Sequence, residues 1–392
     1  MGKMKFLSAL AGIIFIIIFA AFGDQLFAQL EEPIGDETAA SVPESVQSPL
    51  FPVLVHGKWG FIDNTGNIVV DPQFEYARSF SEGFAAVLVG DKYGYIDEIG
   101  NIAIEPQFTH CLDFSEGFAG VQIDGEEGQI YGNWTYIDTE GNILLDPTFN
   151  MTYGFRNGLG MVEVPDGLTI SGAITYGLGE GASDRESIQV PAYGWIDKSG
   201  KYVIEPDKYI LAWPFTEGLA FVQDVSGNQG YIDESGKIVI ELGLLALQFS
   251  EGLAAVLKGE RWAFIDTTGK IVIEPNDFTA NSSSMFSDGV AAVKIDDKWC
   301  YINKSGEVVI TPEREVCFCG VFCDGVALIQ VGKTDSGKWG FMDRTGKFVI
   351  EPKFDWVKLF HDGLAQVRLG DTESGKYGYI DRAGNYVWEP TK

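Results

Sequence analysis

Short runs of hydrophobic and polar residues, separated by turn residues, recur along most of the chain. Residues 83–108, GFAAVLVGDKYGYIDEIGNIAIEPQF, show one copy: an apolar run, an alternating run, a turn and a third run. In the alternating run Tyr93, Tyr95 and Asp97 share one face, because successive side chains of a strand point to opposite faces. Pro106 ends the third run, because proline has no N–H for sheet pairing. The segment therefore predicts a three-stranded antiparallel meander.

The alternating run occurs nine times with a mean period just under 40 residues, which is typical of solenoids and propellers. Its central residues are Trp59-Gly60, Tyr93-Gly94, Trp134-Thr135, Tyr193-Gly194, Gln229-Gly230, Trp262-Ala263, Trp299-Cys300, Trp339-Gly340 and Tyr377-Gly378. We expect residues 50–392 to form an all-β tandem array of nine three-stranded antiparallel β-meander repeats. The taper from a small apolar inner strand to a wider aromatic strand favours a propeller-like ring over an open β-solenoid, although nine is an awkward count for one ring.

Two kinds of turn punctuate the repeats. Connectors with Phe, mostly Ser or Thr, mostly an acid, and Gly are expected to plug the gap between meanders with the Phe and to turn into the next strand. They lie at Phe80–Gly83, Phe114–Gly117, Phe155–Gly158, Phe215–Gly218, Phe249–Gly252, Phe286–Gly289, Phe322–Gly325 and Phe360–Gly363. After each alternating run, an Asp with a Gly three residues later predicts a turn in which the carboxylate accepts backbone N–H groups. Asn303 replaces this Asp once, which suits a turn and not a repeated acid catalyst.

The chain resembles the WG (KWG) repeat family of bacterial proteins. Residues 338–367, KWGFMDRTGKFVIEPKFDWVKLFHDGLAQV, carry the resemblance most clearly, and it extends over about residues 50–392. It implies an exported or envelope protein without an assigned activity, and it transfers no catalytic residue. The fourth and fifth repeats depart most from the pattern, where Gln229 replaces the first aromatic residue and Leu242 the expected proline.

The N-terminal sequence has the layout of a secretory signal peptide. Lys3 and Lys5 precede an apolar run, and Ala28 offers a small residue at a cleavage position. We therefore predict a signal peptide at 1–28, with an uncleaved membrane anchor as the alternative, and a secreted, periplasmic or cell-envelope location. Residues 29–49 predict a flexible linker, and the Gly-rich and acidic segment 165–192 predicts an inserted surface loop.

The net charge of −28 disfavours nucleic-acid partners and anionic membrane surfaces. Contact with a membrane is expected only through an uncleaved anchor. The sequence contains no nucleophile elbow, phosphate loop, zinc-protease motif or EF-hand loop. We predict no catalytic residue, no cofactor and no metal site.

The chain has five cysteines, three of them in CFCGVFC at 317–323. Cys317, Cys319 and Cys323 lack a fourth ligand at zinc-site spacing, because His56, His110 and His361 are scattered. A disulfide within this cluster, or buried thiols, is therefore favoured over a metal site.

Three functions remain open. The first is a non-enzymatic scaffold for an unidentified protein or polysaccharide partner. The second is a carbohydrate- or cell-wall-binding module whose repeated aromatics stack on sugars, although packing between repeats is the favoured role for these rings. The candidate rings are Trp59, Tyr93, Trp134, Tyr193, Trp262, Trp299, Trp339 and Tyr377. The third is a hydrolase that uses acids in a central cleft or at the 165–192 loop.

Overall fold

The computed structural model describes residues 49–124, 131–146, 148–170, 188–243, 245–259, 261–274, 285–333, 336–372 and 374–391. The chain divides into two compact units, Met1–Gln47 with Leu168–Val190, and Ser48–Gly167 with Pro191–Lys392. The predicted signal peptide and all but one residue of the predicted linker lie outside the described residues, as do residues 171–187 of the predicted insertion. In the part that is described, no helix is long and apolar enough to cross a membrane.

The nine motif copies are numbered here as repeats 1 to 9. Repeats 1 to 3 contain β1 (Phe51–Val55), β2 (Lys58–Ile62), β3 (Ile68–Phe74), β4 (Tyr76–Ser81), β5 (Phe84–Val89), β6 (Lys92–Asp97), β7 (Ile102–Phe108), β8 (His110–Cys111), β9 (Phe118–Gln122) and β10 (Trp134–Asp138). Repeats 4 to 6 contain β11 (Met151–Arg156), β12 (Leu159–Ile170), β13 (Ile188–Asp197), β14 (Tyr202–Ala212), β15 (Leu219–Asp224), β16 (Gln229–Asp233), β17 (Ile238–Leu242), β18 (Leu253–Lys258), β19 (Arg261–Asp266) and β20 (Ile271–Ile273). Repeats 7 to 9 contain β21 (Val290–Ile295), β22 (Lys298–Asn303), β23 (Val308–Ile310), β24 (Phe318–Cys323), β25 (Val326–Val331), β26 (Lys338–Asp343), β27 (Phe348–Phe354), β28 (Trp356–Val357), β29 (Leu364–Leu369), β30 (Lys376–Asp381) and β31 (Tyr386–Thr391).

The all-β prediction is confirmed, and each copy of the alternating run forms a strand. The described strands pair antiparallel in three-, four- and seven-stranded sheets. Both ends of the predicted insertion are strand, because β12 and β13 run into it. The Gly three residues after the turn Asp has a positive φ in every repeat, from Gly66 to Gly384. Asp63 Oδ1 accepts the backbone N–H groups of Thr65 and Asn67 at 2.9 Å, so the predicted turn is also confirmed.

The connectors form more than turns. In repeat 2, Tyr76 and Ala77 of β4 pair with Leu88 and Val87 of β5, so the connector supplies a fourth strand. Strands β24 and β28 do the same in repeats 8 and 9. The prediction of three-stranded repeats is therefore incomplete. A register shift between Ala77 and Phe80 breaks the alternation that would have indicated a strand. The expectation that Pro106 ends its strand is wrong, since β7 runs from Ile102 to Phe108.

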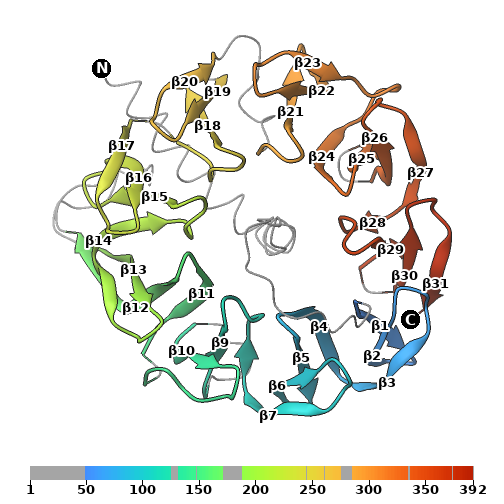
Figure 1. The fold of residues 1–392 in the computed structure, drawn as a ribbon, viewed down its shortest axis with the longest axis horizontal. Coiled ribbons are helices and arrows are strands. Elements are labelled where there is room, and N and C mark those ends of the chain that lie inside the picture. The colour runs from blue at the N-terminus through green and yellow to red at the C-terminus, as the bar shows by residue number, and fades with distance from the viewer. Residues whose placement is uncertain are drawn as a thin grey trace, which may run out of the picture. The chain divides into compact units, whose positions relative to one another are not determined.

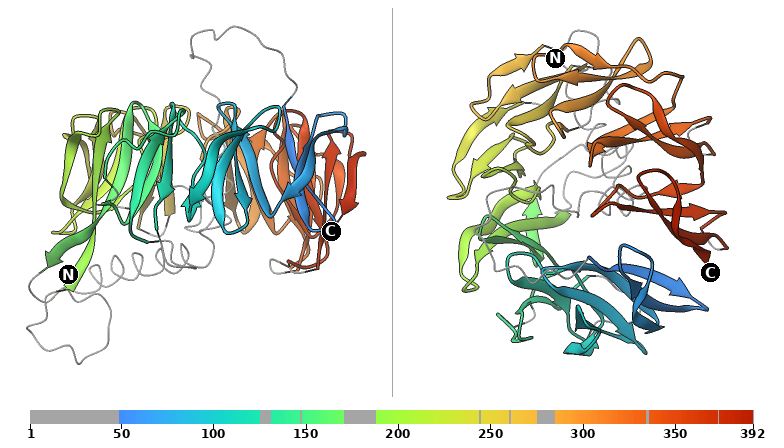
Figure 2. Two further views of the ribbon diagram at one scale, coloured as in Figure 1. Left: turned by 90° about the horizontal axis from the view of Figure 1, so that it is seen from below. Right: turned by 45° about the vertical axis from the view of Figure 1, so that its right-hand side comes forward.

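Within the larger unit, the sheets follow one another around a centre, and β4, β24 and β28 lie nearer to it than β7, β27 and β31 (Figure 1). The connector strand is thus innermost, where the sequence had suggested the small apolar strand. In the side view the strands run between two faces on which the turns gather (Figure 2). The first and last sheets are in contact, since the Tyr379 hydroxyl donates to the Pro52 carbonyl and the Thr391 hydroxyl to that of Leu54. These contacts favour a ring over a solenoid with two free ends.

A pair of aromatic rings fills each junction between consecutive repeats, as predicted for the connector Phe. The Phe packs against the ring two residues after the first aromatic of the preceding repeat, with centroids 4.7 to 5.5 Å apart. The pairs are Phe61–Phe80, Tyr95–Phe114, Tyr136–Phe155, Trp195–Phe215, Tyr231–Phe249, Phe264–Phe286, Tyr301–Phe322 and Phe341–Phe360. Between the last and first repeats, Tyr379 packs against Phe51 at 5.5 Å. The core is therefore a series of interfaces between sheets.

The Gly of the WG pair makes room for the outer strand. A Cβ on Gly60 would lie 2.5 Å from the Val70 carbonyl oxygen and 2.7 Å from the Pro72 nitrogen. The register shifts here between β2 and β3, and Pro72 crosses close over Gly60. Ala263 and Cys300 replace this Gly in repeats 6 and 7, where the outer strands β20 and β23 have only three residues. The Gly is thus required where the outer strand continues past it.

Replacing Gly60 by Ala should lower the free energy of unfolding by about 1–3 kcal/mol, because the added methyl group overlaps the backbone of β3. Ala263→Gly is the matched control, with an expected loss of at most about 1 kcal/mol from added chain entropy. Urea unfolding followed by tryptophan fluorescence measures both. Equal effects of the two changes would contradict the crowding argument.

Candidate functional site

The eight candidate aromatics lie within or between the sheets. Trp134 and Trp262 are buried and the other six are half-buried. Several contact a ring from the next connector strand: Tyr76 lies between Trp59 and Tyr93, and Phe318 lies between Trp299 and Trp339, with centroids 5.5 to 6.4 Å apart. These contacts favour packing between repeats over an open stacking surface.

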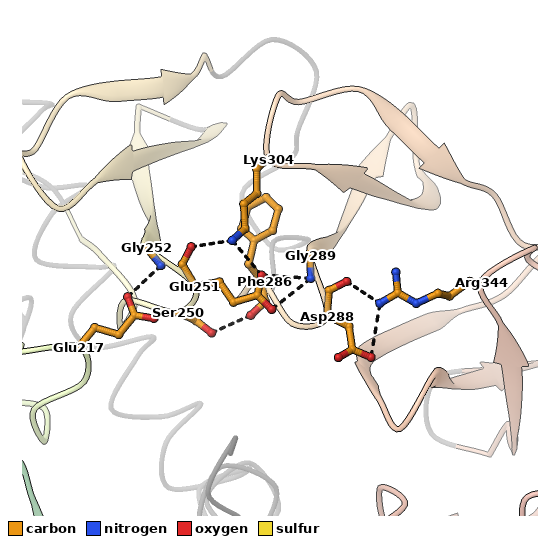
Figure 3. Close-up of polar contacts among 9 residues, drawn as sticks. All are labelled: Glu217, Ser250, Glu251, Gly252, Phe286, Asp288, Gly289, Lys304 and Arg344. Carbon is orange, nitrogen blue, oxygen red and sulfur yellow. Dashed lines mark hydrogen bonds and ion pairs between the residues drawn. The ribbon is translucent and has the colours of Figure 1, made fainter. Parts of the chain in front are cut away.

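The connectors also carry a series of hydrogen bonds from one repeat to the next. Ser250 Oγ donates to the Phe286 carbonyl at 2.7 Å (Figure 3). Ser287 Oγ donates to the Phe322 carbonyl at 2.6 Å. Ser81 and Ser115 make the same bond to Phe114 and Phe155. In repeat 8 a thiol takes this role, since Cys323 Sγ donates to the Phe360 carbonyl at 3.3 Å.

The acids of four connector turns also bond to the next repeat. Both Glu82 and Gly83 have positive φ, as a two-residue type I′ hairpin requires. The Glu82 carboxylate accepts the backbone N–H groups of Glu116 and Gly117 at 2.7 and 2.8 Å. Glu116, Glu217 and Glu251 accept the N–H of the connector Gly in the next repeat, namely Gly158, Gly252 and Gly289. We call these acid and glycine pairs the connector turns.

Four of the connector turns have a basic partner on the following repeat. The residue after the turn Asp or Asn supplies it, and the N···O distances are 3.1 to 3.4 Å. The pairs are Lys198–Glu116, Lys304–Glu251, Arg344–Asp288 and Arg382–Asp324. Lys304 Nζ and Arg344 Nη2 also donate to the backbone carbonyls of Glu251 and Asp288 (Figure 3). The repeated acids therefore act as acceptors between repeats, which the sequence could not indicate because each partner lies 34 or more residues away.

Glu163 is a buried acid that the sequence analysis missed. It occupies a position in β12 that is Leu88 in repeat 2, and burial raises its pKa above the ordinary value. The Asn150 amide donates to it at 3.4 Å, and the Tyr193 hydroxyl lies within hydrogen-bonding reach. Hydrolysis of glycosides normally uses two carboxyl groups that flank the bond. The polar neighbours described around Glu163 are the Asn150 amide and tyrosine hydroxyls, and not the second carboxyl group that this reaction uses.

The thiols are held in apolar surroundings. Burial raises the pKa of Cys111 and Cys319 to about 12 and that of Cys300 to about 11, so these groups are neutral at physiological pH. Cys317 Sγ contacts the Gln330 carbonyl at 3.3 Å. Neither Cys317 nor Cys319 forms a disulfide, and the described residues contain no group of three or more metal ligands. Of the two favoured alternatives for the cluster, buried thiols hold for Cys319, whereas Cys317 and Cys323 are half-buried.

Sequence comparison identifies the family. The profile described as "WG containing repeat" matches residues 59–93, 93–126, 134–167, 193–224, 230–262, 262–299 and 339–372, more than half of the chain. The chain belongs to the WG-repeat family. No curated protein matches the sequence significantly.

Solved structures similar to this WG-repeat chain share little sequence with it. One titled "Crystal structure of the eukaryotic initiation factor" has 11% identity and a TM-score of 0.49, covering 87% of this chain and 95% of its own. BamB from Moraxella catarrhalis has 11% identity and a TM-score of 0.42, covering 76% and 92%. AztD from Citrobacter koseri has 12% identity and a TM-score of 0.39, covering 88% and 93%.

Removing one connector hydroxyl should weaken the junction that it spans. Ser250→Ala leaves the buried Phe286 carbonyl without this donor, and we expect the free energy of unfolding to fall by about 1–2 kcal/mol. Thr216 occupies the same connector position, but its buried hydroxyl has no hydrogen-bond partner. The matched change Thr216→Val should therefore be neutral or stabilising in the same chemical denaturation experiment. A loss for Thr216→Val as large as for Ser250→Ala would contradict the proposed bond.

The turn acids should make stability depend on pH at the acid end. The Thr65 hydroxyl bond, followed by the Asn67 backbone bond, lowers the pKa of Asp63 from 3.8 to about 2. A depressed folded-state pKa stabilises the protein above the unfolded value, and this stabilisation is lost as the pH falls from about 4 to about 2.

Thermal unfolding measured from pH 7 to pH 2 checks this expectation. Asp63→Asn keeps an acceptor without the charge, as Asn303 does in repeat 7. Below about pH 4 the melting temperature of the wild type should fall relative to that of this variant. A difference that stays constant over the whole range would overturn the assignment.

Proposed function

We propose that this WG-repeat chain is a non-enzymatic, exported scaffold that presents a broad surface to a protein or polymer partner. The observation that carries the proposal is the use of the repeated acids. In the connector turns, carboxylates accept N–H groups of the next repeat or pair with its basic side chains. Groups committed in this way are not available as an acid and base pair in catalysis.

The binding residues are expected among exposed positions that differ between repeats. Positions shared by all repeats build the junctions, so they carry no information that distinguishes one part of the array from another. Export rests on residues 1–28, and contact with a membrane is proposed only if that segment stays uncleaved.

Export and binding are tested together on the full chain. Mass spectrometry of the secreted or envelope fraction should find a mature N-terminus at Gln29. Chemical cross-linking in that fraction, followed by reconstitution with the purified partner, should give a saturable complex. A chain retained in the cytoplasm with an intact N-terminus would exclude the exported scaffold, and turnover in a broad hydrolase screen would exclude the non-enzymatic one.

Replacing one of the repeated aromatic rings distinguishes a role in packing from a role in sugar binding. Trp339→Ala should lower the free energy of unfolding by about 2 kcal/mol, because the half-buried ring packs against Phe318. Sedimentation with insoluble cell-wall polysaccharide should be the same for the variant and the wild type at a temperature where both are folded. Binding to the polysaccharide that the variant loses while its stability is unchanged would support the carbohydrate-binding alternative instead.

A further inference from the structure

One outer strand lacks the proline that the other repeats place at their edge. Eight repeats have a Pro directly after the acid, or after Thr311 in repeat 7, at Pro72, Pro106, Pro147, Pro206, Pro275, Pro312, Pro352 and Pro390. Repeat 5 has Leu242 at this position. A proline on an edge strand has no N–H to offer, and it blocks pairing with another chain. Repeat 5 is therefore the repeat without this protection.

The structure shows what the missing proline changes. Strand β17 has a register shift between Ile238 and Ile240, as β3 has between Ile68 and Val70. It then pairs with β16 in an unbroken register from Tyr231↔Ile240 to Gln229↔Leu242. In repeat 1, the register shifts over the corresponding stretch, between Trp59 and Phe61. Strand β17 is the last strand of its seven-stranded sheet, with β16 as its neighbour among the described strands. The edge is therefore regular from Ile240 through Leu242, and half of its backbone groups point away from β16.

The side chains of this edge combine apolar surface with negative charge. Ile238 and Val239 are 41% and 43% exposed, and Glu241 is also exposed. The intervening Ile240 is buried, because the turn at Gly269 of the next repeat lies over it. Lys237, directly before the strand, donates its backbone N–H to the Asp233 carboxylate of its own turn at 3.1 Å.

We propose that the edge of β17 binds an extended peptide segment of a partner protein by strand addition, with aliphatic side chains beside Val239 and a Lys or Arg beside Glu241. This inference rests on the proposed scaffold function and names its partner chemistry. Main-chain hydrogen bonds supply affinity in this mode, and alternate side chains supply specificity. An acid on an edge strand favours a basic cross-strand neighbour. The net charge of −28 opposes a second copy of the chain at this edge.

A synthetic peptide tests the site on the full chain. The probe is fluorescein-labelled Thr-Lys-Thr-Val-Thr-Val-Thr-amide at physiological salt, in which Lys and Val share one face as Glu241 and Val239 do, with binding measured by fluorescence anisotropy. Val239→Lys should weaken binding about tenfold or more, because it removes apolar contact and adds a like charge. Val349→Lys is the matched control: Val349 is 40% exposed at the equivalent position of β27, a repeat that retains Pro352. This control should leave binding unchanged.

Two further probes separate strand pairing from charge attraction. The same peptide with alternate backbone nitrogens methylated keeps its charge and loses the main-chain donors, so it should not bind measurably. Hydrogen exchange with the unmodified peptide should slow at the amides of residues 238–242. Leu242→Pro restores the proline of the other repeats and should also reduce binding.

Several results would overturn the proposal. These are equal weakening by Val239→Lys and Val349→Lys, equal affinity of the methylated peptide, or slowed exchange only outside β17. Self-association that Val239→Lys abolishes would assign the edge to a second copy instead. A natural partner that still forms its complex with the Val239→Lys variant would refute the β17 site and leave the scaffold function standing.

Discussion

The contact between a connector phenylalanine and an aromatic ring of the preceding repeat is the interaction on which the array depends. A sheet of three or four strands cannot bury both faces alone, and in this chain each sheet buries a face against its neighbours. The ring pairs lie 4.7 to 5.5 Å apart, a geometry that adds about 0.5–1.5 kcal/mol beyond apolar burial. At the junction of the last and first repeats, Phe51 takes the place of the connector phenylalanine. Stability is thus distributed over the junctions and not over separate folding units.

The polar groups, like the rings, connect consecutive repeats. A connector turn puts a Glu in the left-handed region, which is uncommon for residues other than glycine. At Glu82 that conformation places the carboxylate against two backbone N–H groups of the next repeat. The local cost of the turn is therefore offset by hydrogen bonds across the junction. Burying a junction in this way leaves fewer backbone groups unpaired between sheets.

The repeated elements could be predicted from sequence because their causes are local. A Gly with positive φ, an Asp that caps its own turn and a short alternating strand each depend on neighbours within a few residues. The fourth strand could not be predicted in this way, because the shift between Ala77 and Phe80 interrupts its alternation. The partner of Glu82 lies 34 residues away, and no local pattern reveals it. Glu163 was missed because its burial depends on Asn150 and Tyr193, which join it only in the folded sheet.

Departures from the repeat are informative because the repeated residues already have structural roles. Gly60, for example, has no side chain and so allows Pro72 to cross over it. In repeats 6 and 7 both the Gly and the long outer strand are lost, so the departure stays consistent within each repeat. Repeat 5 instead keeps Gly230 and loses the proline, in addition to the first aromatic residue, and its outer strand stays in register with β16 from Ile240 to Leu242. Packing within the repeat does not explain the loss of the proline, whereas pairing with a further strand would.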